Sequence, residues 1–234
     1  NRTRGVHLAS AGNNSGRKIP YGRRRQDQDS RAYCRRKPVQ TMGGTSGGLD
    51  AYIRLLTHLP ADMGAAIVIV NHITVLPTKL HEILPRYTTM PVELITERLD
   101  IQPNHVFIIP SNRDLHVSNG EFRLKPISKP RGWHDVITVF LCSLVQHWDG
   151  KLVAVIVSGL DGDGAAALSS IKQVGGITIA QSPETAKEPD MPESAIESGD
   201  IDFVGSPEGI AEELVRIAHA SVIKTKTPGA TQPS

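Results

Sequence analysis

The sequence predicts an α/β fold: a doubly wound, mostly parallel sheet with helices on both faces and a small β-hairpin. The first observation is that apolar runs of strand length alternate with helical patterns from Pro38 onward, as in parallel strands joined by crossover helices. The second is that residues 66–70 and 152–157 are continuous apolar runs, typical of central strands buried on both faces. The third is Asn119-Gly120 between two further runs, which indicates a hairpin.

The first half of the predicted domain fits this fold element by element. A weak strand at 39–42 precedes a helix whose apolar positions begin at Leu49 and which Pro60 stops. After the buried strand at 66–70, the pattern predicts a short helix at 80–87 interrupted by Pro85, strands at 92–95 and 106–109, and hairpin strands at 115–117 and 121–124.

The second half continues the alternation. A helix at 136–147 leads to the buried strand at 152–157. The next helix would use Leu168, Ile171 and Val174 as its apolar face and end at Gly175-Gly176. A strand at 177–180 follows, and Ser206-Pro207 caps a last helix, whose apolar stripe is Ile210, Leu214 and Ile217.

The two ends of the chain differ from the predicted domain, which spans 38–224. Residues 1–40 contain eleven Lys or Arg against Asp27 and Asp29, a balance of +9. Because the whole chain carries +2, the remaining residues carry −7. We expect 1–37 to be a basic disordered segment and 225–234 to be a polar tail. The acidic balance of the domain argues against nucleic acid as its partner.

The composition also excludes several classes of protein. No apolar run approaches the ~18 residues that span a bilayer, and the arginine-rich start lacks the apolar core of a secretory signal. Cys34 and Cys142 lie far apart, so no disulfide framework follows. The sequence therefore predicts a cytoplasmic protein that does not insert into membranes.

The acidic run Asp161-Gly162-Asp163-Gly164 matches half of a calcium loop. No third carboxylate ligand follows at the required step, so we predict no metal site there.

The candidate site is organised around residues 43–48, where the adjacent hydroxyls of Thr45 and Ser46 are embedded among four glycines ahead of a helix. His72 follows the strand at 66–70, and Asp163 follows the strand at 152–157. The carboxyl ends of parallel strands are where such sheets place their chemistry. A hydroxyl needs an adjacent base to act as a nucleophile, imidazole suits neutral pH, and a carboxylate can orient it. Backbone N–H groups at the following helix start could stabilise an oxyanion.

Each of these signals also has another interpretation. A histidine that ends a buried strand is more often structural than catalytic, and glycine-rich turns more often bind phosphate than carry a nucleophile. The turn at 43–48 lacks the lysine of a phosphate loop, and no Gly-x-Gly-x-x-Gly pattern follows the first strand. Nucleotide binding at the turn remains an alternative that thermal stabilisation by a nucleotide would reveal.

Several segments together resemble the CheB-type chemoreceptor methylesterase domain, most closely the version in CheB/CheR hybrid proteins, which join a methylesterase to a methyltransferase. The resemblance covers about 39–217. It is carried by 43–49, Leu59-Pro60-Ala61-Asp62, Val70-Asn71-His72, Met90-Pro91-Val92, 103–106, 110–115, Lys129-Pro130-Arg131-Gly132, 158–164, Gly175-Gly176, 182–187 and 191–196.

The resemblance implies a CheB C-terminal-domain-like fold and hydrolysis of glutamate methyl esters on chemoreceptors by a Ser-His-Asp triad, without a cofactor. Glutamine deamidation by the same apparatus is also implied. His72 takes the position of the base and Asp163 that of the orienting acid. Thr45 takes the position of the nucleophile, with Ser46 beside it. The implied partners are the cytoplasmic helices of methyl-accepting chemoreceptors, and a methyltransferase or receiver domain.

The chain departs from the family pattern at several places. Thr45 replaces a serine, and its extra methyl adds bulk and restricts χ1. Asp161 and Asp190 stand where the family has glycine, and Glu193 where it has arginine, so each adds negative charge near the expected groove. Extra carboxylates should weaken the encounter with acidic receptor segments. These departures keep open a second interpretation, a catalytically weak or inactive module that regulates or binds proteins in a sensory pathway.

Overall fold

The computed structural model describes residues 37–71, 78–128 and 134–224, and of the last four of these only the backbone. The predicted basic segment at 1–37, except for Lys37, lies outside the described residues, as do the polar tail at 225–234, His72 and the Lys129-Pro130-Arg131-Gly132 motif. The strands are β1 (Val39–Gly44), β2 (Ala66–Asn71), β3 (Val92–Leu94), β4 (Val106–Ile108), β5 (Arg113–Ser118), β6 (Glu121–Pro126), β7 (Leu152–Ile156), β8 (Ile177–Gln181) and β9 (Phe203–Gly205).

The helices alternate with these strands along the chain. The α-helices are α2 (Gly48–Thr57), α3 (Leu80–Ile83), α4 (Val136–His147), α5 (Leu168–Gln173), α6 (Asp190–Glu197) and α7 (Pro207–Lys224). The described residues also form three short 3₁₀ helices, η1 (Leu84–Arg86), η2 (Ala165–Ala167) and η3 (Pro183–Thr185).

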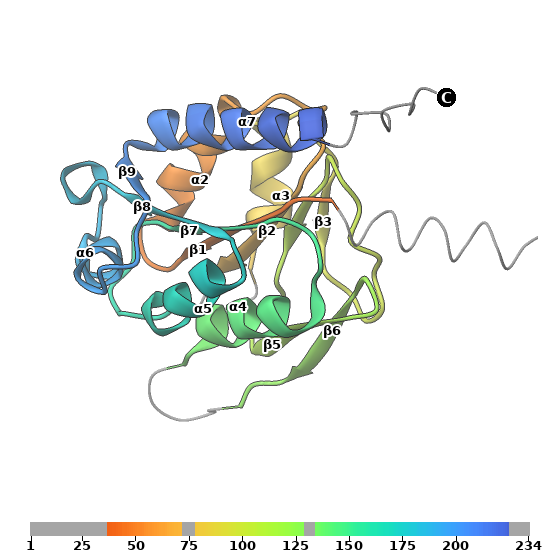
Figure 1. The fold of residues 1–234 in the computed structure, drawn as a ribbon. Coiled ribbons are helices and arrows are strands. Elements are labelled where there is room, and N and C mark those ends of the chain that lie inside the picture. The colour runs from red at the N-terminus through yellow and green to blue at the C-terminus, as the bar shows by residue number, and fades with distance from the viewer. Residues whose placement is uncertain (1–36, 72–77, 129–133, 225–234) are drawn as a thin grey trace, which may run out of the picture.

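Seven strands form one sheet in the order β3-β4-β2-β1-β7-β8-β9, and each neighbouring pair is parallel. Helices α2, α3 and α7 cover one face, whereas α4, α5 and the separate β5–β6 hairpin cover the other (Figure 1). The predicted doubly wound α/β fold with a peripheral hairpin is therefore confirmed. The chain moves outward from β1 through β2 and returns to β7 on the other side, so the order of the sheet reverses between β1 and β7. Parallel-sheet proteins bind ligands at such a switch point.

The central strands divide their side chains between two cores. On β7, Leu152, Ala154 and Ile156 pack toward the α4 side, while Val153 and Val155 pack toward the α2 and α7 side. All five are almost completely buried, as the continuous apolar run predicts.

Two predicted boundaries are supported by local geometry. Asn119 and Gly120 both have positive φ, 55° and 80°, as a two-residue hairpin turn of type I′ requires. At the end of α5, Gly176 N donates to Ile171 O and Gly175 N to Lys172 O, each over 2.9 Å, and Gly175 has φ 77°. This is a Schellman C-terminus.

Two predicted helix faces are wrong in detail. Val174 is 52% exposed at the end of α5 and does not join its buried face, which is Leu168 and Ile171. Leu49 is 38% exposed in the first turn of α2. The buried stripe of α2 instead comprises Ala51, Tyr52, Leu55 and Leu56, with Gly48 at its start.

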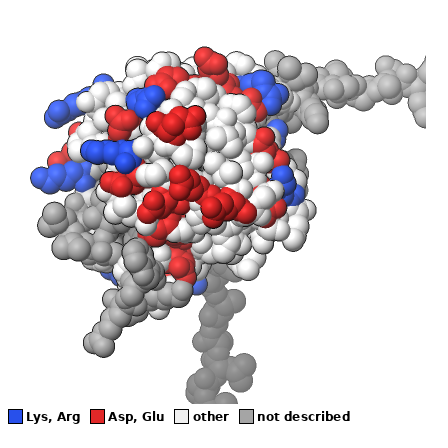
Figure 2. Space-filling view, turned by 90° about the vertical axis from the view of Figure 1, so that its left-hand side faces the viewer, with Lys and Arg blue, Asp and Glu red and all other residues white. Residues whose placement is uncertain are grey.

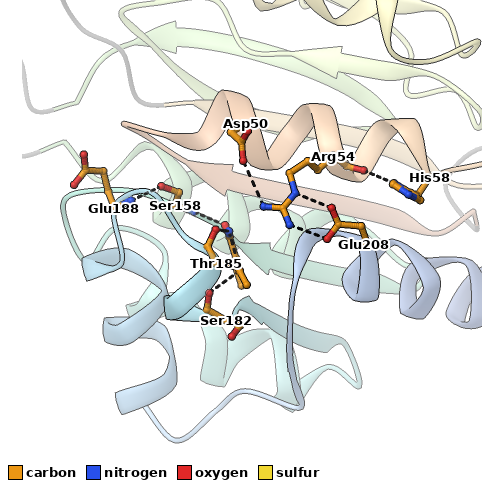
Figure 3. Close-up of polar contacts among 9 residues, drawn as sticks. Asp50, Arg54, His58, Ser158, Ser182, Thr185, Glu188 and Glu208 are labelled. Atoms are coloured by element: carbon orange, nitrogen blue, oxygen red, sulfur yellow. Dashed lines mark hydrogen bonds and ion pairs between the residues drawn. The ribbon is translucent and has the colours of Figure 1, made fainter.

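An ion pair joins α2 to α7 across the top of the sheet. Arg54 Nε donates to Glu208 Oε1 over 2.7 Å and Arg54 Nη2 to Glu208 Oε2 over 2.9 Å, while Asp50 approaches the same guanidinium at 3.5 Å (Figure 3). Hydrogen bonding to Arg54 lowers the pKa of Glu208 to about 2. The bidentate geometry fixes the two helices relative to each other.

We expect Glu208→Gln to lower the free energy of unfolding at pH 7 by roughly 0.5–1 kcal/mol, a small effect because both side chains are about one-third exposed. The pKa of Glu208 is lower in the folded than in the unfolded chain. The pair therefore stabilises the fold above about pH 4.5, and this contribution is lost as the pH falls toward about 2. Urea unfolding from pH 3 to pH 8 would measure it. Glu212→Gln makes the same charge change at an exposed site on α7 and should have little effect. Equal losses in the two variants at pH 7 would contradict the interpretation.

Candidate active site between β1 and β7

Thr45 follows the carboxyl end of β1, in the tight turn that leads into α2. Its backbone N donates to Ser158 O over 3.0 Å, and its hydroxyl Oγ1 accepts a hydrogen bond from Leu160 N over 3.1 Å. Its carbonyl accepts from Gly48 N over 3.1 Å. Gly47 has φ 77°, a left-handed conformation that favours glycine. The turn therefore directs the Thr45 hydroxyl toward the loop that follows β7.

Ser46 lies differently, although it is the next residue. Its side chain is exposed, and within the described part of the chain its hydroxyl makes no hydrogen bond. Its carbonyl accepts a hydrogen bond from Ser158 Oγ over 3.0 Å. Of the two predicted hydroxyls, only that of Thr45 contacts the loop after β7.

The first two glycines of the turn belong to β1 and are needed for internal packing. A Cβ atom on Gly43 would lie 2.7 Å from Ile137 Cγ2, and one on Gly44 would lie 2.7 Å from both Tyr52 Oη and Val157 Cγ2. The lack of a Cβ atom at the two glycines leaves space for side chains that pack from opposite faces of the sheet. The absence of a side chain at these two positions is therefore required by packing inside the protein.

Asp163 is 7% exposed in the loop after β7 and is held at the start of α4. Its Oδ2 accepts from Ile137 N over 2.8 Å, and its Oδ1 accepts from Thr138 N over 2.9 Å and Thr138 Oγ1 over 2.8 Å. Burial raises the pKa of Asp163, whereas the hydrogen bonds from Thr138 and Ile137 offset part of this rise, and the nearby charge of Asp161 adds to it. Donors on both oxygens, at a helix N-terminus, suit a carboxylate.

A cavity of about 420 Å³ opens beside these residues. Leu160 lines it and is 50% exposed, and the N–H of the same residue donates to Thr45 Oγ1, so Thr45 lies next to the cavity wall. Of the lining residues only Asp163 was predicted as a site residue, because the lining comes from two separate segments of the chain. The lining residues are His134, Asp135, Thr138, Leu160, Asp161, Gly162, Asp163 and Ala166.

The strand before the predicted base is described, although the base is not. His72 lies outside the described residues, but Asn71 directly before it is the last residue of β2 and pairs with Gly44 of β1. Of the predicted site residues, Thr45 and Asp163 are therefore placed on the two sides of the β1–β7 switch point. Asn71 brings the chain to the same edge of the sheet.

The acidic departures have structural roles of their own. Asp161 Oδ1 accepts from Asp163 N over 3.0 Å, which shapes the loop. Asp190 and Glu193 are exposed in the first turn of α6, where the helix dipole favours carboxylates. Acidic side chains gather across the face at which the strands end (Figure 2). Among the described residues, no group of three His, Cys, Asp or Glu is arranged to hold a metal ion.

Comparison with known proteins gives a consistent set of relatives. Residues 41–214 match the family described as CheB methylesterase. A Burkholderia thailandensis protein named protein-glutamate methylesterase/protein-glutamine glutaminase 4 is 30% identical over 182 residues, which are 77% of this chain and 53% of that protein. A Leptospira interrogans protein named "Putative protein-glutamate methylesterase/protein-glutamine glutaminase" is 32% identical over 178 residues, which are 75% of this chain and 92% of that protein.

The fold also has a solved counterpart. The crystal structure of the Thermotoga maritima CheB methylesterase catalytic domain superposes with a TM-score of 0.69 at 28% identity, covering 78% of this chain and 98% of that one. The chain spans about half the length of the Burkholderia relatives it matches. Within the described ranges, no helix has both the length and the hydrophobicity needed to cross a bilayer.

We expect Thr138→Val to raise the pKa of Asp163 further, because the lost hydroxyl hydrogen bond favours the ionised carboxyl. The charge-assisted bond should contribute about 1.5–3 kcal/mol to the free energy of unfolding at pH 7. This contribution should shrink as the pH falls through the pKa of Asp163, because the neutral carboxyl binds the donor less strongly. Carboxyl carbon chemical shifts measured against pH would report the pKa. An unchanged or lowered pKa would show that the hydroxyl does not stabilise the charge.

Proposed function

Because this chain belongs to the CheB methylesterase family, we propose that it hydrolyses glutamate γ-methyl esters on chemoreceptors, with Thr45 as nucleophile, His72 as base and Asp163 as the group that orients the base. We further propose that the same site deamidates glutamine side chains. The observation that carries the assignment of the nucleophile is the 3.1 Å hydrogen bond from Leu160 N to Thr45 Oγ1, beside the cavity.

The proposed reaction proceeds through an acyl-enzyme. Thr45 Oγ1 attacks the ester carbonyl carbon while His72 accepts the hydroxyl proton, and the tetrahedral intermediate collapses as His72 returns that proton to the departing methanol. Water then attacks the acyl group with His72 again as base. Glutamate leaves, and the proton returns to Thr45. Asp163 stabilises the imidazolium that forms in both halves of the cycle.

The backbone around Thr45 supports charge stabilisation at this site. The N–H of Leu160 donates to Thr45 Oγ1, and the oxyanion on a carbon bonded to Oγ1 would lie within reach of the same donor. Leu160 lies in the loop after β7, and the preceding Gly159 makes two backbone hydrogen bonds, with Glu188 and Met191. A backbone donor held in this way needs little reorganisation during the reaction, which is what electrostatic catalysis requires.

A second candidate function is a regulatory or protein-binding module that has lost most of its activity. The threonine at the nucleophile position favours it, because the extra methyl restricts χ1 and adds bulk beside the hydroxyl. A Cβ atom on the neighbouring Gly159 would lie 2.7 Å from both Thr45 Oγ1 and Met191 Cε. The two candidates differ in whether Thr45 is acylated.

The substrate and partners follow from the same proposal. We propose that the protein acts in the cytoplasm on the helices of methyl-accepting chemoreceptors, next to a methyltransferase, as in CheB/CheR hybrids, or a receiver domain. The acidic balance of the residues after 40 supports a folded domain that does not bind nucleic acid.

Labelling with a fluorophosphonate and peptide mass spectrometry tests the nucleophile. We expect a slow adduct on Thr45 that Thr45→Ala and His72→Ala abolish. Thr45→Ser should accelerate both labelling and methanol release from methylated receptor by about 10- to 100-fold, because it removes the methyl that hinders approach. Ser46→Ala is the matched control and should label like the wild type. An adduct on Ser46 would overturn the assignment of the nucleophile. No adduct and no methanol release would favour the regulatory module.

A further inference from the structure

Ser158, two residues after the end of β7, links the turn at 43–48, here called the nucleophile turn, to the segment that leads into α6. Its hydroxyl donates to Ser46 O over 3.0 Å. The same hydroxyl accepts from Glu188 N over 2.9 Å (Figure 3). The side chain is almost completely buried, with Ser158 1% exposed. One hydroxyl therefore makes one donated and one accepted hydrogen bond to two backbone segments that are far apart in sequence.

The backbone of Ser158 is itself fixed on the central sheet. Its N–H donates to Gln181 Oε1 over 3.0 Å, and Gln181 Nε2 donates in turn to Thr185 O over 2.9 Å. Its carbonyl accepts from Thr45 N over 3.0 Å. The hydroxyl is thus presented from a rigid strand end and can set the position of softer segments around it.

The two residues after Ser158 continue this link. Gly159 exchanges backbone hydrogen bonds with the α6 side, because its N donates to Glu188 O and its O accepts from Met191 N, each over 3.0 Å. Leu160 then turns back to donate to Thr45 Oγ1. Residues 158–160 therefore contact both the nucleophile turn and the segment at 188–191. The Ser158 hydroxyl bridges the two segments.

The fit around Gly47 shows how closely the turn approaches this hydroxyl. A Cβ atom on Gly47 would collide with Ser158 Oγ and would lie 2.8 Å from Lys187 Cβ. Gly47 is therefore required both by its left-handed φ and by the approach of the turn to Ser158.

We propose that Ser158 is a positioning residue: by holding the Ser46 carbonyl and the Glu188 amide, its hydroxyl keeps Thr45 Oγ1 at the Leu160 N–H, in register with the cavity. The inference rests on the proposed function for its kinetic consequence. Ser158 acts through the backbone of the turn and takes no part in proton transfer. The same two hydrogen bonds also oppose a shift of the turn by one residue, which would place the Ser46 hydroxyl where that of Thr45 now lies.

Ser158→Ala should lower the rate of fluorophosphonate labelling of Thr45, and kcat for methanol release, by about 10- to 100-fold, because a displacement of ~1 Å costs about a hundredfold. KM should change less than about twofold, and the midpoint of the pH–rate profile, set by His72, should not move. Ser158→Thr keeps a hydroxyl at this position and should restore the rate to within about threefold of the wild type.

Ser143→Ala is the control for a loss that is only structural. Ser143 is 4% exposed on α4, and its hydroxyl accepts from Val117 N over 2.9 Å, so the variant also removes a buried serine hydrogen bond. It should lower the melting temperature to a similar degree and leave the labelling rate unchanged. Equal labelling rates in Ser158→Ala and Ser143→Ala would overturn the inference.

Amide hydrogen exchange separates this inference from the proposed function. Ser158→Ala should accelerate exchange at the amides of Thr45 and Gly48 by about tenfold or more, and Ser143→Ala should not. If neither the wild type nor Thr45→Ser reacts with the fluorophosphonate, the proposed function is wrong, and faster exchange in Ser158→Ala alone would still support its hold on the turn. Unchanged exchange at both amides would reject that hold, whatever the activity.

Discussion

The parallel pairing of β1 with β7 is the interaction on which the site depends. The two strands pair from Val39 with Leu152 through Gly43 with Ile156, and the hydrogen bonds continue past this register, from Val157 N to Gly43 O and from Thr45 N to Ser158 O. Beyond that point the chain after β1 leads into α2 and the chain after β7 leads into α5, on opposite faces of the sheet. Thr45 follows β1 and Asp163 follows β7, so the two residues come from the two strands between which the order of the sheet reverses.

Ile137 of α4 both packs against the sheet and binds the carboxylate of Asp163. Its side chain lies against Gly43 of β1, and a Cβ atom on Gly164 would lie 2.9 Å from its Cγ2, while its backbone N donates to Asp163. The small residues at the strand end thus let the start of α4 approach the sheet closely. That approach places the helix N-terminus at the buried carboxylate, whose charge it stabilises. The glycines around the site therefore serve the position of Asp163 as well as the shape of the turn.

The sequence predicted the fold well where the physical signal is local. The continuous runs that became β2 and β7, the Asn119-Gly120 turn and the bounds of α4 all follow from periodicity or turn chemistry. By contrast, α6 and β9 were missed, because α6 is short, polar and contains Pro192, and β9 has only three residues. The predicted face of α2 was wrong because Ala51 and Tyr52 are buried and Leu49 is not. The helix and sheet that pack against α2 determine which of its residues are buried.

The candidate site was predictable only in part. Thr45, Ser46, His72 and Asp163 were predicted from their residue types after strands and from the family resemblance, and their roles stay a prediction. The partners of Asp163 on α4 are 25 and 26 residues away in sequence, and no local pattern connects them to it. The same holds for Ser158 and Glu188, which are separated by 30 residues. Such contacts come from the topology of the sheet, so they could not be read from spacing.

The most direct test of the central claim is the crystal structure of the protein after reaction with a small fluorophosphonate. The account predicts phosphorus bonded to Thr45 Oγ1 between the ends of β1 and β7, with a phosphonyl oxygen accepting from the backbone N–H of Leu160. Phosphorus bonded to Ser46, or a Thr45 hydroxyl that remains unmodified under conditions that label serine esterases completely, would contradict it.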